Sequence, residues 1–267
     1  MCKRLVFWVP LFYLMVLSLA YAGFGDGKAA YDGGDYAKAY KEFKDLAEHG
    51  NAGAQYFMGK MYELGNGVSQ DGEQALKWYL KAAGQGNADA QFSLGMMYEL
   101  GNGVLQDWGE ALKWYLKAAE QGNADAEHNL GYMYANGRGV SQDYAEAMKW
   151  YRKAAEQGNA FAQNALGWMY NNGQGVPENP PEAFKWYLKA AEQGNALAQN
   201  NLGEMYAQGQ GTTQDLVQAH MCFNLAAAQG NTKAQENRDE LAQQMTPDQI
   251  SEAESLAAEW KPKGKDR

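Results

Sequence analysis

The side chains in this sequence that could carry out chemistry are few and scattered. The chain has three histidines, His49, His128 and His220, and two cysteines, Cys2 and Cys222. None of these residues stands at a spacing typical of a Cys–His or Ser–His–Asp catalytic set, or of a zinc site. We therefore expect no metal, no cofactor and no enzymatic activity.

One recurring column of Asp or Asn could be taken for a catalytic or calcium-binding array. Each member is followed three residues later by Glu or Gln, in the pairs Asp71/Gln74, Asp107/Glu110, Asp143/Glu146, Asn179/Glu182 and Asp215/Gln218. An N-cap acceptor with Glu or Gln at the third helical position is the signature of a capping box. Since all five copies fit that signature, we predict five helix starts rather than a metal site.

The dipeptide Gly-Asn recurs at an interval of 36 residues along the chain, at Gly50, Gly86, Gly122, Gly158, Gly194 and Gly230. A strict period of this size is typical of stacked supersecondary units. We expect each Gly to end one helix in a left-handed turn and each Asn to cap the next helix.

Each period contains two stretches with apolar residues at helical spacing. In the first repeat they are 52–64, which Gly65 ends, and 72–84. Gly59 and its equivalents lie in the middle of the first helix, so we expect a partner helix to cross too closely for a Cβ. The regularly spaced Trp78, Trp114, Trp150 and Trp186 are predicted to be core residues, with a carbohydrate platform as the alternative.

These patterns predict an all-α solenoid of helix hairpins. Its domains are a signal peptide (1–22), N-terminal helices (23–51), five repeats within 52–231, C-terminal capping helices (232–260) and a frayed tail (261–267). The five repeats are 52–87, 88–123, 124–159, 160–195 and 196–231. In the C-terminal part, Thr246-Pro247-Asp248-Gln249 predicts a capping box with proline in the first helical turn.

The signal peptide is predicted from a positive start, an apolar run from Leu5 to Leu19 and the small-residue pattern Ala20-Tyr21-Ala22. We expect cleavage after Ala22 and export to the periplasm or the extracellular medium. The alternative is a retained membrane anchor, but the run is short for a span and Pro10 interrupts it. After cleavage we expect no membrane span.

The composition argues against two classes of partner. The formal net charge is −9, and removal of the leader with its two cations changes it to −11. Such an acidic chain is poorly suited to nucleic acid or anionic membrane surfaces. Cleavage also leaves Cys222 as the one cysteine, so no intrachain disulfide can form and the fold depends on packing.

The repeat resembles the Sel-1-like repeat family, a branch of the tetratricopeptide superfamily. The shared pattern is A-x-A-Q-x-x-L-G-x-M-Y-x-x-G-x-G-V-x-x-D-x-x-x-A-x-x-W-Y-x-K-A-A-x-Q-G-N, over Ala52 to Asn231. The resemblance implies a right-handed α-solenoid of antiparallel helix hairpins that binds partners on its concave side, as family members do when they serve as adaptors. A cysteine-rich subgroup is linked to β-lactam binding or hydrolysis, but this chain lacks the cysteines of that subgroup.

In the related tetratricopeptide hairpin, the second, fifth, ninth, twelfth and thirteenth positions of the first helix line the groove. Here the fifth position is Tyr56, Phe92, His128, Asn164 and Asn200; the ninth is Lys60, Met96, Tyr132, Trp168 and Glu204; the thirteenth is Leu64, Leu100, Asn136, Asn172 and Gln208. These positions vary while their neighbours repeat. Variation within one chain marks positions released from packing, and several carry large apolar side chains.

We therefore predict a groove that anchors apolar or aromatic side chains of a peptide segment or protein partner near the N-terminal and central repeats. Its predicted residues are Tyr56, Lys60, Phe92, Met96, His128, Tyr132, Asn136, Asn164, Trp168 and Asn172. The first alternative is an assembly factor that binds saccharide, such as peptidoglycan or exopolysaccharide, because aromatic faces beside amides also suit sugars. A hydrolase related to the cysteine-rich proteins is a distant third.

Overall fold

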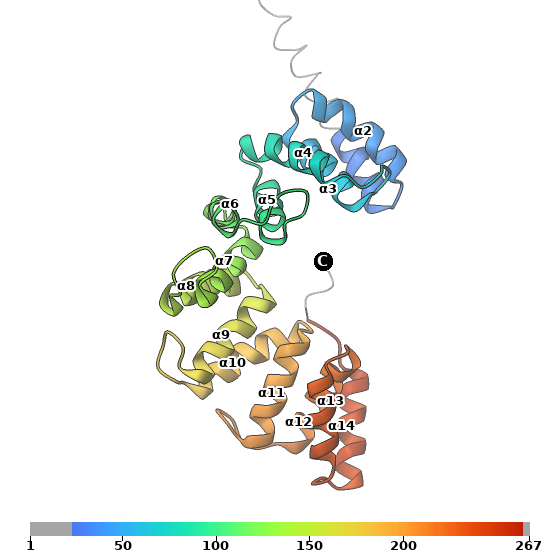
Figure 1. Ribbon diagram of the computed structural model, residues 1–267. Coiled ribbons are helices and arrows are strands. Elements are labelled where there is room, and N and C mark those ends of the chain that lie inside the picture. Colours follow the sequence, from blue (N-terminus) through green and yellow to red (C-terminus); the bar gives the residue numbers. More distant parts are fainter. Residues whose placement is uncertain (1–22, 264–267) are drawn as a thin grey trace, which may run out of the picture. The chain divides into compact units, whose positions relative to one another are not determined.

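The computed structural model describes residues 23–263, and all regular secondary structure within them is helical. The predicted signal peptide at 1–22 lies outside the described residues. After a helical segment at 23–32, the helices are α2 (Tyr36–Glu48), α3 (Ala52–Leu64), α4 (Gly72–Gly84), α5 (Ala88–Leu100), α6 (Trp108–Glu120), α7 (Ala124–Asn136), α8 (Tyr144–Glu156), α9 (Ala160–Asn172), α10 (Pro180–Glu192), α11 (Ala196–Gln208), α12 (Leu216–Ala228), α13 (Thr232–Ala242) and α14 (Pro247–Glu259) (Figure 1).

The helices form consecutive hairpins, in which each odd-numbered helix from α3 to α11 packs against the next one. This confirms the predicted all-α solenoid of helix pairs. The chain divides into two compact units, Met1–Asn123 and Ala124–Arg267. In the described residues, the first unit holds the segment 23–32 and α2 to α6, and the second holds α7 to α14.

The predicted Gly-Asn junctions are present between hairpins. Gly86, for example, has a φ of 87°, and the side chain of Asn87 accepts a hydrogen bond from the N–H of Ala90 at 2.8 Å. Asn51, Asn159, Asn195 and Asn231 cap their helices in the same way. Each junction therefore fixes the chain direction between one helix and the next.

In the capping boxes predicted at the second helices, one of the two reciprocal hydrogen bonds forms. Asp107 accepts a hydrogen bond from the N–H of Glu110 at 3.0 Å, but its own N–H donates to the carbonyl of Tyr98 at 2.9 Å. The reciprocal bond from the Glu110 side chain has no donor left, so that carboxylate pairs instead with Lys113 at 2.6 Å. A full capping box is present at Thr246 and Gln249, as predicted.

The mid-helix glycines are required by aromatic rings rather than by a crossing backbone. A Cβ on Gly59 would stand 2.5 Å from Cδ1 of Tyr79, and the other four repeats place a Tyr or Phe ring at the same point. The expected close approach is therefore present, but its partner is an aromatic side chain. Tyr79 and Tyr115 are fully buried and belong to the core of the first unit.

A column of buried glutamines, which the sequence patterns above did not reveal, joins successive hairpins. Gln55 donates through Nε2 to the carbonyl of Ala47 at 3.0 Å, and its Oε1 accepts from Gln85 at 2.7 Å. Gln91, Gln163 and Gln199 repeat both bonds. Each amide thus links a second helix, the following first helix and the end of the next second helix.

The tryptophans are half-buried in three repeats and buried at Trp186, and a lysine covers each ring. Lys81, Lys117, Lys153 and Lys189 hold their Nζ atoms 4.1 Å from the ring centroids of the tryptophans three residues earlier. These lysines therefore contribute to the packing of the second helices.

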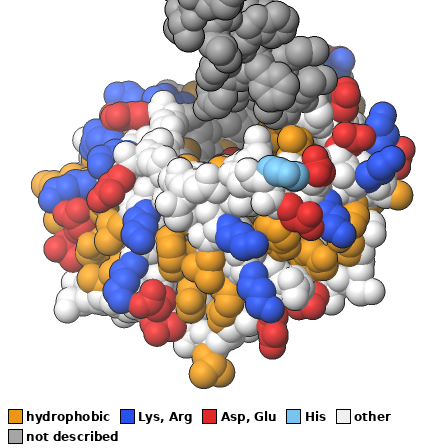
Figure 2. All heavy atoms as spheres, turned by 90° about the horizontal axis from the view of Figure 1, so that it is seen from above, with side chains coloured by type: hydrophobic (Ala, Val, Ile, Leu, Met, Phe, Trp, Pro, Cys, Tyr) orange, Lys and Arg blue, Asp and Glu red, His pale blue; other side chains and the backbone are white. Residues whose placement is uncertain are grey.

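On the face that Figure 2 shows, Lys and Arg side chains alternate with Asp and Glu, and neither sign forms a continuous patch.

The first three residues of the tail, 261–263, lie within the described part of the chain. The N–H of Lys263 donates to the carbonyl of Glu192 at 2.7 Å, and its Nζ lies 2.6 Å from the Glu192 carboxylate. The remaining tail, 264–267, lies outside the described residues. Within 23–263, no helix combines the length and apolar character needed to cross a membrane.

Candidate functional site

The predicted site residues lie on one side of the first helix of each repeat, which we call the first-helix face. Positions four residues apart on a helix share a face. On α7 the fifth, ninth and thirteenth positions are His128, Tyr132 and Asn136, and on α9 they are Asn164, Trp168 and Asn172. The candidate residues have different surroundings in the two units.

In the first unit, the aromatic candidates pack partly into the protein. The ring centroid of Tyr56 lies 5.9 Å from that of Tyr79, and Phe92 lies 5.8 Å from Tyr115. Burial, with a smaller contribution from nearby negative charge, raises the pKa of Tyr56 to about 12. Both candidate rings are half-buried, so they form the wall of the first-helix face here.

The other two candidates of the first unit are also half-buried. Lys60 holds its Nζ 5.3 Å from the ring centroid of Tyr31, an arrangement that suits a cation–π contact. Met96 lies on α5, four residues after Phe92. Neither residue offers a protruding anchor for a partner.

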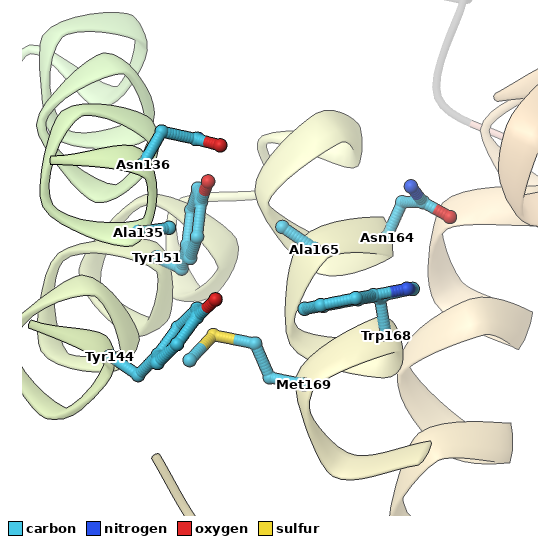
Figure 3. A pocket seen from close by; sticks show the side chains of 8 residues that line it. All are labelled: Ala135, Asn136, Tyr144, Tyr151, Asn164, Ala165, Trp168 and Met169. Atoms are coloured by element: carbon cyan, nitrogen blue, oxygen red, sulfur yellow. The ribbon is translucent and has the colours of Figure 1, made fainter. Parts of the chain in front are cut away.

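In the second unit, three predicted residues meet around one hollow between α7, α8 and α9, which we call the apolar pocket. Its volume is about 290 Å³. Figure 3 shows residues of α7 and α8 on one side and residues of α9 on the other. The lining residues are Ala135, Asn136, Tyr144, Tyr151, Asn164, Ala165, Trp168 and Met169.

Aromatic and apolar groups make up most of the apolar pocket. Tyr151 and Met169 are buried, whereas Trp168 remains 45% exposed. Burial raises the pKa of the Tyr151 hydroxyl, so the phenol stays neutral at physiological pH. A half-exposed indole beside a buried phenol offers a surface for an apolar or aromatic side chain.

Two amides on the apolar pocket have complementary hydrogen-bonding capacity left. Asn136 donates through Nδ2 to the carbonyl of Tyr132 at 2.8 Å, which leaves its Oδ1 as an acceptor. The Oδ1 of Asn164 accepts from Nδ2 of Asn201 at 3.1 Å, which leaves its Nδ2 as a donor. One acceptor and one donor match the N–H and C=O groups of an extended peptide.

The two remaining candidates of α7 flank this pocket. The ring centroid of His128 lies 5.7 Å from that of Tyr151 and 6.0 Å from that of Phe161, and its Nδ1 lies 3.0 Å from Oδ1 of Asn129. Tyr132 is 37% exposed. His128 is therefore part of an aromatic cluster, and Tyr132 extends the accessible aromatic surface.

The predicted site residues do not include two exposed apolar side chains at the second position of the first helix. Phe161 on α9 is 61% exposed and Leu197 on α11 is 56% exposed. The signal was present in the sequence, because the same column holds Gly53, Asp89 and Asp125 in the earlier repeats. The change from glycine or aspartate to large apolar residues at an equivalent place distinguishes both residues.

A second hollow, which we call the acidic pocket, lies beside Trp168 between α9 and α11. Its volume is about 230 Å³. Asn172, also a predicted site residue, donates from Nδ2 to the carbonyl of Trp168 at 2.8 Å. The lining residues are Trp168, Asn171, Asn172, Tyr187, Asn201, Glu204, Met205, Gln208 and Gln210.

Within residues 23–263, no group of three or more His, Cys, Asp or Glu side chains could hold a metal ion. Cys222 is buried, and burial raises the pKa of its thiol to about 12, so it is a poor nucleophile. What the second unit offers is shaped aromatic surface with amides and a carboxylate beside it.

Comparison with known families gives a match over most of the chain. The family model described as Sel1 repeat matches residues 52–87, 88–123, 124–159, 160–195 and 196–231. A comparison with curated proteins gives no match.

Several solved structures are similar. A Sel1 repeat protein from Oxalobacter formigenes is 35% identical with a TM-score of 0.78, covering 92% of this chain and 99% of that one. A protective antigen of uropathogenic Escherichia coli that displays an SLR fold is 40% identical with a TM-score of 0.79. The match covers 90% of this chain but 53% of the E. coli protein, so the present chain spans about half of that relative.

Proposed function

This chain belongs to the Sel1 repeat family, whose members are generally protein-interaction scaffolds, and on that premise we propose that it is a non-enzymatic adaptor. The adaptor holds an extended peptide segment of a partner protein against the first-helix face of its second unit. The observation that carries this proposal is the apolar pocket, where Trp168 is 45% exposed and the amides of Asn136 and Asn164 keep unused hydrogen-bonding capacity.

The proposed mode of binding follows from that geometry. An apolar side chain of the segment enters the apolar pocket and covers Trp168, which removes apolar surface from water. The segment's backbone donates to Oδ1 of Asn136 and accepts from Nδ2 of Asn164. Since the pocket is formed by packed helices, little ordering is needed before binding, and this supports affinity for a short segment.

A selection from a random peptide library tests the proposal. The purified chain from residue 23 onward is used to enrich displayed peptides, and the enriched peptides are synthesised and their affinities measured. We expect a shared apolar position, and we expect Trp168→Ala to weaken binding by about tenfold or more. Leu105→Ala is the matched control, because Leu105 is 91% exposed in the first unit and far from this pocket in the sequence.

Two results would contradict the adaptor proposal. One is the absence of any enriched motif. The other is peptide binding that Trp168→Ala leaves unchanged. Specific binding to peptidoglycan fragments or exopolysaccharide that is lost in Trp168→Ala would instead favour the saccharide alternative.

We also propose that the protein acts outside the cytoplasm, in the periplasm or the extracellular medium. The support is the positive, apolar and small-residue pattern of residues 1–22. A fusion to an alkaline phosphatase that is active only after export tests this. Activity should require residues 1–22, and equal activity of a fusion that lacks them would refute the proposal.

A further inference from the structure

We propose that the acidic pocket binds the side chain of an arginine or lysine in the partner segment, next to the apolar residue held by the apolar pocket. This inference rests on the proposed adaptor function and specifies the chemistry of its partner. Five residues of the acidic pocket carry the argument: Trp168, Asn172, Tyr187, Glu204 and Gln208.

The first observation is a carboxylate that is held in place but not neutralised. Glu204 on α11 is half-buried, and its Oε1 accepts hydrogen bonds from Nδ2 of Asn200 and Nδ2 of Asn237, each at 3.0 Å. Both donors are neutral amides, so the negative charge remains. No lysine or arginine among residues 23–263 forms an ion pair with Glu204. A fixed, partly desolvated carboxylate with an unused oxygen favours a cationic ligand.

The effect of this charge is visible at its neighbour. Burial raises the pKa of Tyr187, and the negative charge of Glu204 raises it further. The Tyr187 ring is buried beneath the acidic pocket and stays neutral. The pocket therefore contains one formal charge, and that charge is negative.

The second observation is an aromatic surface at the correct place. Trp168 lines both the apolar pocket and the acidic pocket and is 45% exposed. Tryptophan is the aromatic side chain that attracts cations most strongly. This fold already pairs lysine with tryptophan, for example Lys189 with Trp186 at 4.1 Å, although those pairs lie on the second helices.

The third observation is the supply of hydrogen-bond acceptors. The Nδ2 of Asn172 is engaged with the backbone, so its Oδ1 is the group left for a ligand. The amide of Gln208 adds a second carbonyl oxygen to the lining. A guanidinium is positively charged and has five N–H donors. A carboxylate with neighbouring amide oxygens therefore binds a guanidinium better than it binds a neutral side chain.

The charges of both pockets decide between a basic and an acidic partner. Neither lining contains a lysine or arginine, so an acidic or phosphorylated segment would find no counter-charge. The next hollow along the second unit, between α11, α12 and α13, adds Glu240 to Glu204. The chain as a whole carries a formal charge of −9, which steers cationic segments toward it.

Because Trp168 separates the two pockets, a segment that fills both must carry an apolar and a basic residue close together. The test uses amidated peptides of the form Gly-Ser-Leu-Ser-Z-Ser-Gly, in which Z is arginine or its uncharged isostere citrulline. The affinity of each peptide is measured by titration for the wild-type chain, for Glu204→Gln and for Glu156→Gln. Glu156 is exposed on α8 outside both pockets, so its variant removes the same charge elsewhere.

We expect the arginine peptide to bind the wild-type chain and Glu156→Gln about tenfold more tightly than the citrulline peptide. In Glu204→Gln this preference should disappear, while the citrulline peptide keeps its wild-type affinity and so shows that the variant is folded. Equal binding of both peptides to the wild-type chain would overturn the basic-residue inference and leave the adaptor proposal intact. Failure of both peptides overturns the inference, and the library selection then decides the adaptor proposal separately.

Discussion

A Cβ on Gly95 would stand 2.5 Å from Cδ1 of Tyr115, a distance that a real Cβ contact does not reach. Gly95 lies in the middle of α5, where alanine is the better helix former by about 1 kcal/mol. Tyr115 is fully buried and cannot move away without disturbing the core. The packing of the ring on the glycine therefore outweighs the helix propensity at this position.

We predict that Gly95→Ala lowers the free energy of unfolding by about 1–3 kcal/mol, because overpacking exceeds the gain in propensity. Urea unfolding followed by circular dichroism measures this. The matched control is Gly84→Ala in the same unit, since no atom lies within 4 Å of its added Cβ. That variant should be as stable as the wild-type chain or more stable, and destabilisation of both variants alike would refute the packing argument.

The half-formed capping boxes lead to a second prediction. Asp107 caps α6 through its side chain, whereas Glu110 pairs with Lys113 at the surface. Asp107→Ala should therefore cost about 1 kcal/mol of stability, and Glu110→Gln should cost less than about 0.5 kcal/mol. Thermal unfolding of the two variants provides the comparison. If Glu110→Gln were as harmful as Asp107→Ala, the ion pair with Lys113 would have to contribute as much stability as the cap.

A third prediction concerns the one repeat in which the buried glutamine is replaced by glutamate. Glu127 is buried and accepts a hydrogen bond from Nε2 of Gln157 at 2.6 Å. Burial raises the pKa of its carboxyl group, although Gln157 and Lys153 oppose the shift. At neutral pH the ionised group is therefore less stable in the folded protein than in the unfolded chain. Glu127→Gln should stabilise the protein by about 1 kcal/mol at pH 7.

The pH dependence gives this prediction its sign. A raised pKa means that the folded state holds the proton more tightly, so the stability lost to ionisation at neutral pH is recovered as the pH falls through the folded-state pKa toward the unfolded value. The stability difference between Glu127→Gln and the wild-type chain should then shrink between pH 7 and about pH 4. Paired urea titrations across this range measure it. A difference that grows on acidification would mean that the Lys153 charge dominates.

The fold could be predicted from the sequence because its determinants are local and repeated. The Gly86-Asn87 junction and the Asp107 cap depend on a few consecutive residues, and helical spacing identifies the helices between them. The buried glutamines escaped notice because their partners lie in neighbouring helices: Gln55 bonds to Ala47 on one side and Gln85 on the other. A polar residue within a repeat is expected to lie at the surface unless its hydrogen-bond partners are known.

The candidate site could be predicted less well, for a related reason. The position of a residue in the repeat indicates which face it occupies, and it identified Trp168 and Asn164 beside the apolar pocket. The position in the repeat does not indicate how deeply a side chain is buried. Phe92, a predicted site residue, lies against Tyr115, whereas Phe161, which is not among the predicted residues, is exposed. Depth depends on the sizes of side chains on several helices at once, and a single column of the repeat does not contain that information.

The last prediction separates surface aromatic residues from core aromatic residues in the second unit. Trp168 is 45% exposed and Tyr132 is 37% exposed, whereas Tyr151 is 6% exposed. The double variant Tyr132→Ala/Trp168→Ala should lose less than about 2 kcal/mol of stability, because both rings are only partly buried. Tyr151→Ala should lose about 3 kcal/mol or more, because it leaves a cavity against Gly131.

Urea unfolding of both variants is compared with their binding of the enriched peptides. The double variant should remain folded and lose peptide binding, which assigns the two rings to recognition. A large loss of stability with unchanged peptide binding would instead assign them to the core. Because Trp168 lines both pockets, Tyr132→Ala alone should weaken binding less than Trp168→Ala alone. The reverse order would place the partner nearer to α7 than the proposed site between α7 and α11.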